Sequence, residues 1–141
     1  MNSNKKSTGM DMKVKLSTLW IFILFNITFL DIHGLLKPGF LEKVMTGTID
    51  GIQMTEELLL LGAIMMEIPI AMVLLSRVLK YRVNRWANII AGVTTIAIFI
   101  GNLSTDLDTI FVGTIVVVAM LLIIWYALKW PNPVLSPNNK T

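Results

Sequence analysis

Four long apolar runs constrain this chain more than any other feature. A helix needs about 17 to 25 predominantly apolar residues to cross the ~30 Å hydrocarbon core of a bilayer. Four stretches of the 141-residue chain reach that length, and we predict membrane spans at residues 16–36, 58–79, 87–103 and 110–128. Because the runs are continuous rather than alternating, they indicate helices and not the strands of a barrel. The expected fold is therefore all-α, a four-transmembrane-helix bundle that forms one membrane domain over residues 1–141.

The composition supports a membrane protein and excludes several other classes. Charged residues make up 15% of the chain, against about 25% in soluble domains. The chain has no cysteine, so disulfides, thiolate nucleophiles and cysteine metal sites are excluded. It has one histidine, His33, and no motif of a known hydrolase, metalloprotease or P-loop enzyme. We therefore expect no catalytic residue and no metal site, and the sequence defines no cofactor.

The basic residues are distributed unequally between the two ends of the predicted bundle. Of the 12 Lys and Arg residues, all except Lys37 and Lys43 fall on the side that carries the two chain termini. Short cytoplasmic segments of membrane proteins are enriched in Lys and Arg. The sequence therefore predicts a multi-pass protein of the inner (plasma) membrane with both termini in the cytoplasm. The net charge of +3 then reflects topology and contact with anionic lipid rather than nucleic-acid binding.

Aromatic residues gather on the same predicted side of the membrane. The tryptophans near the cytoplasmic ends of the spans are Trp20, Trp86, Trp125 and Trp130. Tryptophan commonly anchors helices at the level of the lipid headgroups, so we predict an interfacial belt there. Arg82, Arg85 and Trp86 lie in the short loop before the third span. They form either an interfacial anchor or a docking surface for a partner protein or anionic lipid.

The connection between the first two spans, residues 37–57, is long for a helical bundle. Pro38 and Gly39 end the first span. Apolar residues then recur at positions 40, 41, 44 and 45, which is the spacing of a short amphipathic helix. We predict that this helix lies at the outer interface. It either caps the outer end of the bundle or forms a lid over an outward-facing cavity.

Polar residues inside the apolar runs are the candidate functional residues. A polar group in contact with lipid is costly, so such residues should face protein or water. At ~1.5 Å per residue, Glu67, Asn26 and Thr95 lie at similar depths near the bilayer midplane. Pro69 cannot donate a hydrogen bond to the carbonyl of Met65, which leaves an oxygen free near the carboxyl of Glu67. A shallower layer near the outer end contains Asp31, His33 and Asn102.

The third span has the most polar face of the four. Its polar and small residues recur at steps of three and four, at Asn88, Gly92, Thr95, Phe99 and Asn102. Residues at this spacing share one side of a helix. We expect that side to look into the bundle.

The intramembrane residues support two functions of different classes. In the first, the protein binds a small ligand or ion in an outward-facing pocket. Glu67 would hold a cation or carry a proton there, and the other five candidates would orient the ligand or line the mouth. In the second, the protein is a non-catalytic membrane subunit or scaffold whose polar side chains serve helix packing. Its partners would be the lipid bilayer and either a second copy, in a homo-oligomer, or a partner membrane protein.

Several short segments around the spans carry a recognisable pattern. They are KVKLSTLW (13–20), DI and KPGF within 31–40, YRVNRWANIIAG (81–92) and WYALKWP (125–131). Together they resemble a family of small bacterial four-helix integral membrane proteins of unknown function, and VNRWANI is the most specific of them. The resemblance implies a bacterial inner-membrane location and the four-span topology, and it implies no activity. A remoter likeness to DoxX-like four-helix proteins rests on architecture only.

Overall fold

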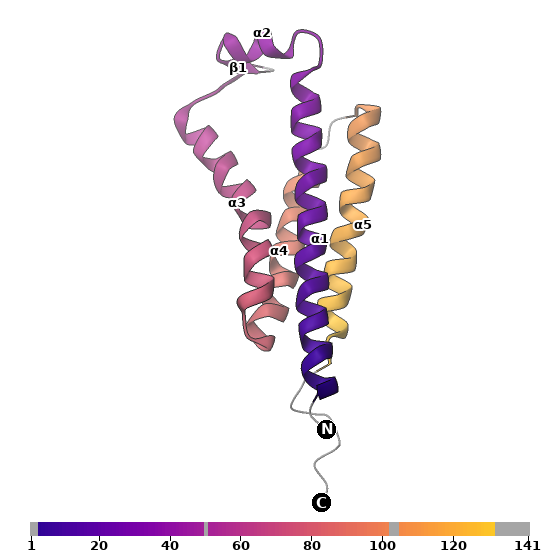
Figure 1. Ribbon diagram of the computed structural model, residues 1–141. Coiled ribbons are helices and arrows are strands. Elements are labelled where there is room, and N and C mark those ends of the chain that lie inside the picture. Colours follow the sequence, from indigo (N-terminus) through magenta and orange to yellow (C-terminus); the bar gives the residue numbers. More distant parts are fainter. Residues whose placement is uncertain (1–2, 50, 102–104, 132–141) are drawn as a thin grey trace, which may run out of the picture.

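The computed structural model describes residues 3–49, 51–101 and 105–131 and is mostly helical (Figure 1). Its elements in chain order are α1 (Ser3–Leu35), α2 (Phe40–Met45), β1 (Thr48–Ile49), β2 (Ile52–Gln53), α3 (Glu56–Val78), α4 (Tyr81–Gly101) and α5 (Leu107–Lys129). Four of these helices, α1, α3, α4 and α5, are long and apolar enough to cross a membrane. The predicted all-α fold with four spans is therefore confirmed.

The four long helices form a closed ring in which each packs against two neighbours. α1 and α4 each contact both α3 and α5. α2 and the β1–β2 hairpin lie where α1 ends and α3 begins, which we call the loop end of the bundle (Figure 1). The opposite end, where α1 begins and α5 ends, is called the terminus end. Because the chain crosses the bundle four times, its two ends emerge at one side.

The antiparallel hairpin β1–β2 is an addition to the predicted fold. It pairs Thr48 with Gln53 and Ile49 with Ile52. Gly51 has a φ of 83°, a left-handed conformation that glycine adopts without strain. Just after the hairpin, the hydroxyl of Thr55 accepts a 3.3 Å hydrogen bond from the backbone N–H of Leu58. This N-cap fixes the start of α3.

Two helices begin well before their predicted spans. α1 begins at Ser3 rather than at residue 16, and the early start of α4 bears on the core of the bundle. The helix begins at Tyr81, a turn and a half before the predicted start at residue 87. Its first turns contain Asn84 and Asn88, whose side chains are fully buried. The six residues before the predicted start include Arg82, Asn84 and Arg85, which an apolar window excludes, so the prediction stopped short of a turn whose Asn84 nevertheless lies inside the bundle.

Most of the large buried apolar side chains lie in the terminus-end half of the bundle. They include Leu16, Trp20, Ile23, Met72, Met120, Ile123 and Trp130. The predicted tryptophan belt is therefore wrong for two of its members, since Trp20 is 0% and Trp130 5% exposed. Trp130 packs edge-on against Tyr81, with ring centroids 5.3 Å apart. Trp86 and Trp125 are exposed, as an interfacial position requires.

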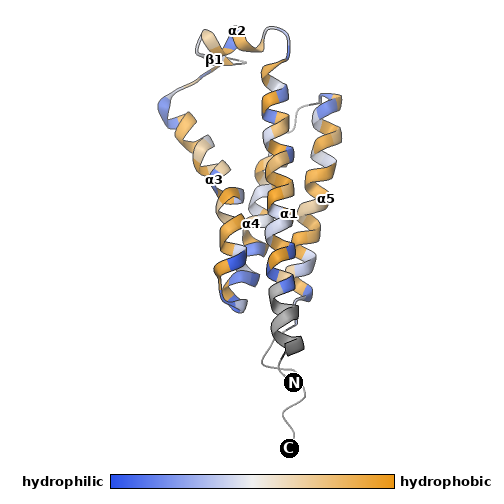
Figure 2. Cartoon of the chain, viewed as in Figure 1, coloured by the Kyte–Doolittle hydropathy of each residue, from blue (hydrophilic) through white to orange (hydrophobic). Residues whose placement is uncertain are grey.

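The four long helices consist mostly of apolar residues, and polar residues gather toward their ends (Figure 2). The outer surface of the bundle exposes many of the apolar side chains. Large side chains on this surface, such as Phe25, Leu74 and Phe111, are 65–72% exposed. In water such a surface would drive aggregation, whereas in a bilayer it meets lipid tails. The structure thus supports a multi-pass membrane protein. The sides on which the termini lie stay a prediction from the charges.

Candidate functional site

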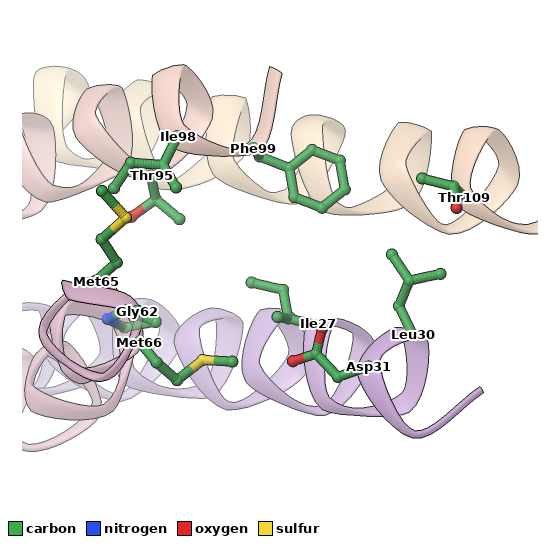
Figure 3. A pocket seen from close by; sticks show the side chains of 11 residues that line it. Ile27, Leu30, Asp31, Gly62, Met65, Met66, Thr95, Ile98, Phe99 and Thr109 are labelled. Carbon is green, nitrogen blue, oxygen red and sulfur yellow. The ribbon is translucent and has the colours of Figure 1, made fainter. Parts of the chain in front are cut away.

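A cavity of about 330 Å³ lies between the long helices in the loop-end half of the bundle (Figure 3). The residues that line it are Ile27, Leu30, Asp31, Gly62, Met65, Met66, Pro69, Thr95, Ile98, Phe99 and Thr109. Of these, only Asp31, Thr95 and Thr109 have polar side chains. The volume falls at the small end of the ~300–1,000 Å³ found for ligand pockets. No residue of α2 belongs to the lining, so α2 acting as a lid stays a prediction.

The cavity exists because α3 separates from α1 toward the loop end. Figure 1 shows this half of α3 leaning away from α1. Pro69 lies inside α3, and a proline at such a position removes one backbone hydrogen bond and bends the helix. Gly62 contributes no side chain, and a Cβ added there would meet nothing within 4 Å. Space between the helices therefore remains unfilled beside both residues.

Asp31 is the one ionisable side chain of the lining. It has no hydrogen bond or ion pair within the part of the chain that the structure describes. Figure 3 shows its carboxylate turned toward Met66, along the wall of the cavity. The side chain is exposed, so in a bilayer its carboxylate would need a cation or a hydrogen-bond donor to offset the loss of water. Asp31 is therefore the group best placed to orient a bound molecule.

Thr95 lines the cavity from α4 and is 6% exposed. Its hydroxyl donates a 2.8 Å hydrogen bond to the backbone carbonyl of Ala91, one turn earlier. The proton is thus used within the helix, and the oxygen is left to accept from a ligand. Asn88 and Gly92 are buried on the same side of α4. The prediction that this side looks into the bundle is confirmed for these residues.

Glu67 does not line the cavity. Its side chain is exposed on the surface of α3. At about 100° per residue, a position two residues from both Met65 and Pro69 points nearly opposite to them, and these two face the cavity. Asn26 is half-buried and donates a 2.8 Å hydrogen bond to the carbonyl of Phe22 in its own helix. The structure therefore does not bring Glu67, Asn26 and Thr95 together.

The other two candidates of the outer layer are His33 and Asn102, and His33 does not line the cavity. His33 stacks on Phe29, with ring centroids 5.9 Å apart. Its Nε2 lies 3.7 Å from Oδ2 of Asp108 at the start of α5. Asn102 lies outside the described residues. Of the six predicted site residues, Asp31 and Thr95 therefore face the cavity.

An ionic cluster at the loop end joins the turn after α1 to the start of α5. The ammonium of Lys37 donates to the carboxylate of Asp106 and lies 3.3 Å from Oδ2 of Asp108. The hydrogen bond to Asp106 raises the pKa of Lys37 above its ordinary value. Both ends of the cluster are partly exposed to solvent. The cluster thus holds two helix ends together without forming a closed site.

A fully buried polar network at the terminus end was not predicted as a unit. The indole N–H of Trp20 and the hydroxyl of Ser76 both donate to Oδ1 of Asn88, over 2.8 and 3.1 Å. The amide of Asn88 donates to the Oδ1 and the carbonyl of Asn84, and Asn84 donates to the carbonyl of Ser76. Its donors and acceptors satisfy one another, so the network leaves no free group for a ligand. The spacing of Asn84 and Asn88, one helical turn, was its only signal in the sequence.

Three further hydrogen bonds join α1 to α3 near this network. The hydroxyl of Ser17 donates to the carbonyl of Val73 over 2.8 Å. It also accepts from Nε of Arg77 over 3.0 Å. Lys13 donates to the carbonyl of Arg77 over 3.3 Å. Polar groups of α1 and α3 are thus used for packing at the terminus end.

The predicted partner residues lie near the start of α4. Arg82 and Trp86 are exposed and Arg85 is half-buried. Whether they contact a partner protein or anionic lipid stays a prediction. Within the described ranges, no group of three or more His, Cys, Asp or Glu side chains could hold a metal ion.

Comparison with known proteins places the chain in a family without extending its function. No curated protein and no solved structure matches it. A family model, described as a family of unknown function (DUF6326), matches residues 8–136. This match covers all four candidate membrane spans and every segment in which the sequence resembled a family of small four-helix membrane proteins. The chain therefore belongs to the family of unknown function DUF6326.

Proposed function

We propose that this small integral membrane protein binds an amphipathic molecule in the cavity between α1, α3 and α4. The cationic or hydrogen-bond-donating group of the molecule lies at Asp31. The observation that carries the proposal is the carboxylate of Asp31, which lines an otherwise largely apolar cavity and has no partner in the described chain. Ionisable residues at such positions in membrane proteins commonly mark ligand or ion pathways.

The rest of the lining supports an apolar body for the ligand. Met65 and Met66 offer flexible, polarizable side chains that adapt to irregular shapes. Phe99 adds an aromatic surface from α4. Thr95 offers a hydroxyl oxygen that accepts one hydrogen bond. A molecule with a compact apolar body and one charged amine matches this combination.

The position of the cavity suggests where the ligand enters. Asp31 is four residues before the end of α1 at the loop end, or about 6 Å along the helix axis. The bias of the basic residues predicts that the loop end lies outside the cell. We therefore infer that the ligand enters from the outer leaflet or the outer aqueous phase.

Thermal unfolding of the detergent-purified protein tests the proposal. We would add 1-adamantylamine, 1-adamantanol or 1-adamantanecarboxylate, which share one apolar body and differ in their polar group. A bound ligand at 100 times its Kd stabilises the folded state by about 2.7 kcal/mol. We expect the amine to stabilise the wild type most, the alcohol less, and the carboxylate not at all. Asp31→Asn should remove the advantage of the amine.

Glu67→Gln is the matched control, because it removes another carboxyl from a spanning helix without touching the cavity. The amine should stabilise this variant as it does the wild type. If Glu67→Gln instead loses the effect and Asp31→Asn keeps it, the site is at Glu67 and the proposal is wrong. Equal effects of all three compounds on every variant would show mere partitioning into the micelle.

A second candidate function is that of a non-catalytic membrane subunit or scaffold. The buried network of Trp20, Ser76, Asn84 and Asn88 favours it, because there the intramembrane polar groups serve helix packing. This reading predicts that none of the three compounds stabilises the protein selectively. The same thermal measurement therefore decides between the two candidates.

A further inference from the structure

The carboxyl of Glu67 lies at the middle of a spanning helix and faces outward. Glu67 is the twelfth of the 23 residues of α3, so it lies about 16 Å from either end of the helix. Its side chain is exposed and has no partner among the described residues. In a bilayer, this position would leave an ionisable group against hydrocarbon, which is among the most costly arrangements a membrane protein can adopt.

Among the residues that the structure describes, no basic side chain lies at the depth of Glu67. In the four membrane spans, each Lys or Arg falls within the first or last five residues of the span. Each of these cations would have to cross most of a leaflet to reach the carboxyl. Glu67 therefore has no ionic partner at its own depth within the part of the chain that the structure describes.

The surface of α3 around Glu67 allows another helix to approach closely. Ala63 and Ala71, one turn to either side, carry only methyl groups on this face, and Leu74 follows at 65% exposure. α1 and α4 pack on other sides of α3. Close helix approach through small residues lets a polar side chain form hydrogen bonds across the interface.

We propose that two copies of the chain pack side by side in the membrane through this face of α3, with the two Glu67 carboxyls meeting at the interface. The partner is a second copy because a twofold axis through this face brings an identical group to the same depth, where the two carboxyls can share a hydrogen bond. Two such groups related by a twofold axis satisfy each other. Both copies insert in the same direction, since the basic residues are strongly biased to one end. In such a pair, residue 67 faces residue 67 and residue 74 faces residue 74.

Cysteine cross-linking in native membranes tests this arrangement, because the chain has no cysteine of its own. Glu67→Cys and Leu74→Cys should each give a disulfide-linked dimer on mild oxidation. Val118→Cys is the matched control: Val118 is also the twelfth residue of a 23-residue helix that starts at the loop end, and it is 52% exposed. We expect at least a tenfold higher dimer yield at positions 67 and 74 than at 118.

Several results would overturn the proposal. Equal yields at positions 67 and 118 would mean random collision in the membrane. A cross-link at 67 without one at 74 would exclude the parallel pair. A product whose mass differs from that of two 15.8 kDa chains would identify another protein as the occupant of this face.

A second measurement uses the wild-type chain, in which the carboxyl of Glu67 is intact, and needs no cysteine variant. Energy transfer between differently labelled wild-type chains in liposomes should report a dimer that dissociates on dilution with lipid. Glu67→Gln should dimerise within about threefold of the wild type, because an amide also donates and accepts. Glu67→Leu should dimerise at least tenfold more weakly. Equal dimerisation of the leucine variant would show that the carboxyl has no part in the contact.

Discussion

The indole N–H of Trp20 on α1 donates a 2.8 Å hydrogen bond to the side-chain oxygen of Asn88 on α4, 68 positions away in the chain. Both side chains are fully buried. The same oxygen accepts from Ser76 on α3, so one amide connects three helices. In a membrane, apolar contacts alone discriminate weakly between helix faces, because lipid is as apolar as leucine. The directional bonds of Asn88 therefore fix how these helices are rotated against one another.

Asn88→Ala should destabilise the protein by about 2–4 kcal/mol. The substitution leaves the donors of Trp20 and Ser76 buried without this acceptor, and each such group costs about 1–3 kcal/mol. Trp20→Phe should cost only about 1 kcal/mol, since Asn88 keeps its bond with Ser76. Unfolding with increasing SDS in mixed micelles measures both values. Thr114→Ala is the control, because its exposed hydroxyl bonds only to Ile110 of its own helix. If all three variants unfold alike, the network does not specify the packing.

The helices themselves could be predicted from the sequence because the bilayer imposes a simple rule. Each crossing needs an uninterrupted apolar run, and the chain shows four. Periodicity also placed Asn88, Gly92 and Thr95 on one side of α4. That side is distinct because the remainder of α4 is more apolar, so the pattern identifies the buried face without any knowledge of the neighbouring helices.

The direction of Glu67 could not be predicted in the same way. α3 is apolar on nearly every side, so periodicity does not show which side packs against α1 and α4. The cost of exposing a carboxyl to lipid favoured an inward position, but Met65, Met66 and Pro69 occupy the inward face instead. The free-energy cost of exposing a carboxyl to lipid applies to the whole assembly in the membrane. A second copy that covers Glu67 would remove that cost without turning the side chain inward. Likewise, the contacts of Trp20 depend on which helices are neighbours, and local sequence does not contain that information.

Two helical glycines should respond oppositely to alanine. A Cβ at Gly113 would lie 2.7 Å from Cε1 of Phe99, whereas a Cβ at Gly62 would meet nothing within 4 Å. Both changes carry the same gain in helix propensity of about 1 kcal/mol. We expect Gly62→Ala to stabilise by about that amount and Gly113→Ala to destabilise by about 1–2 kcal/mol, because the Phe99 ring must move. Adding Phe99→Leu should remove the penalty at Gly113. A Gly113→Ala variant as stable as Gly62→Ala would contradict the close packing of α4 on α5.

The ionic cluster at the loop end should give stability that is lost in strong alkali. The pKa of Lys37 is raised by its hydrogen bond to Asp106, so the folded state holds this proton more tightly than the unfolded state. The stabilisation is complete below the lysine pKa of the unfolded chain, about 10.4. It disappears as the pH rises through the higher value of the folded chain. The difference in thermal stability between wild type and Lys37→Gln should therefore be constant from pH 8 to about 10 and shrink above it. A difference that stays constant to the highest accessible pH would show that the ammonium is not the cause.

Filling the cavity should abolish ligand binding without harming the fold. Gly62 lines the cavity and has open space around its Cα, so the side chain of Gly62→Leu would occupy the volume in which we place the apolar body of the ligand. We expect this variant to lose the stabilisation by 1-adamantylamine while its ligand-free unfolding temperature stays equal to or above that of the wild type, because leucine also favours the helix.

Gly34→Leu is the matched control, since Gly34 is a helical glycine of α1 with equally open surroundings that does not line the cavity. The control should respond to the amine as the wild type does. An undiminished response of Gly62→Leu would place the amine elsewhere on the protein, and a loss in both variants would show that any bulky residue near the loop end disturbs binding. Only a loss confined to Gly62→Leu, together with the loss in Asp31→Asn, locates the apolar body and the charged group of one ligand in the same cavity.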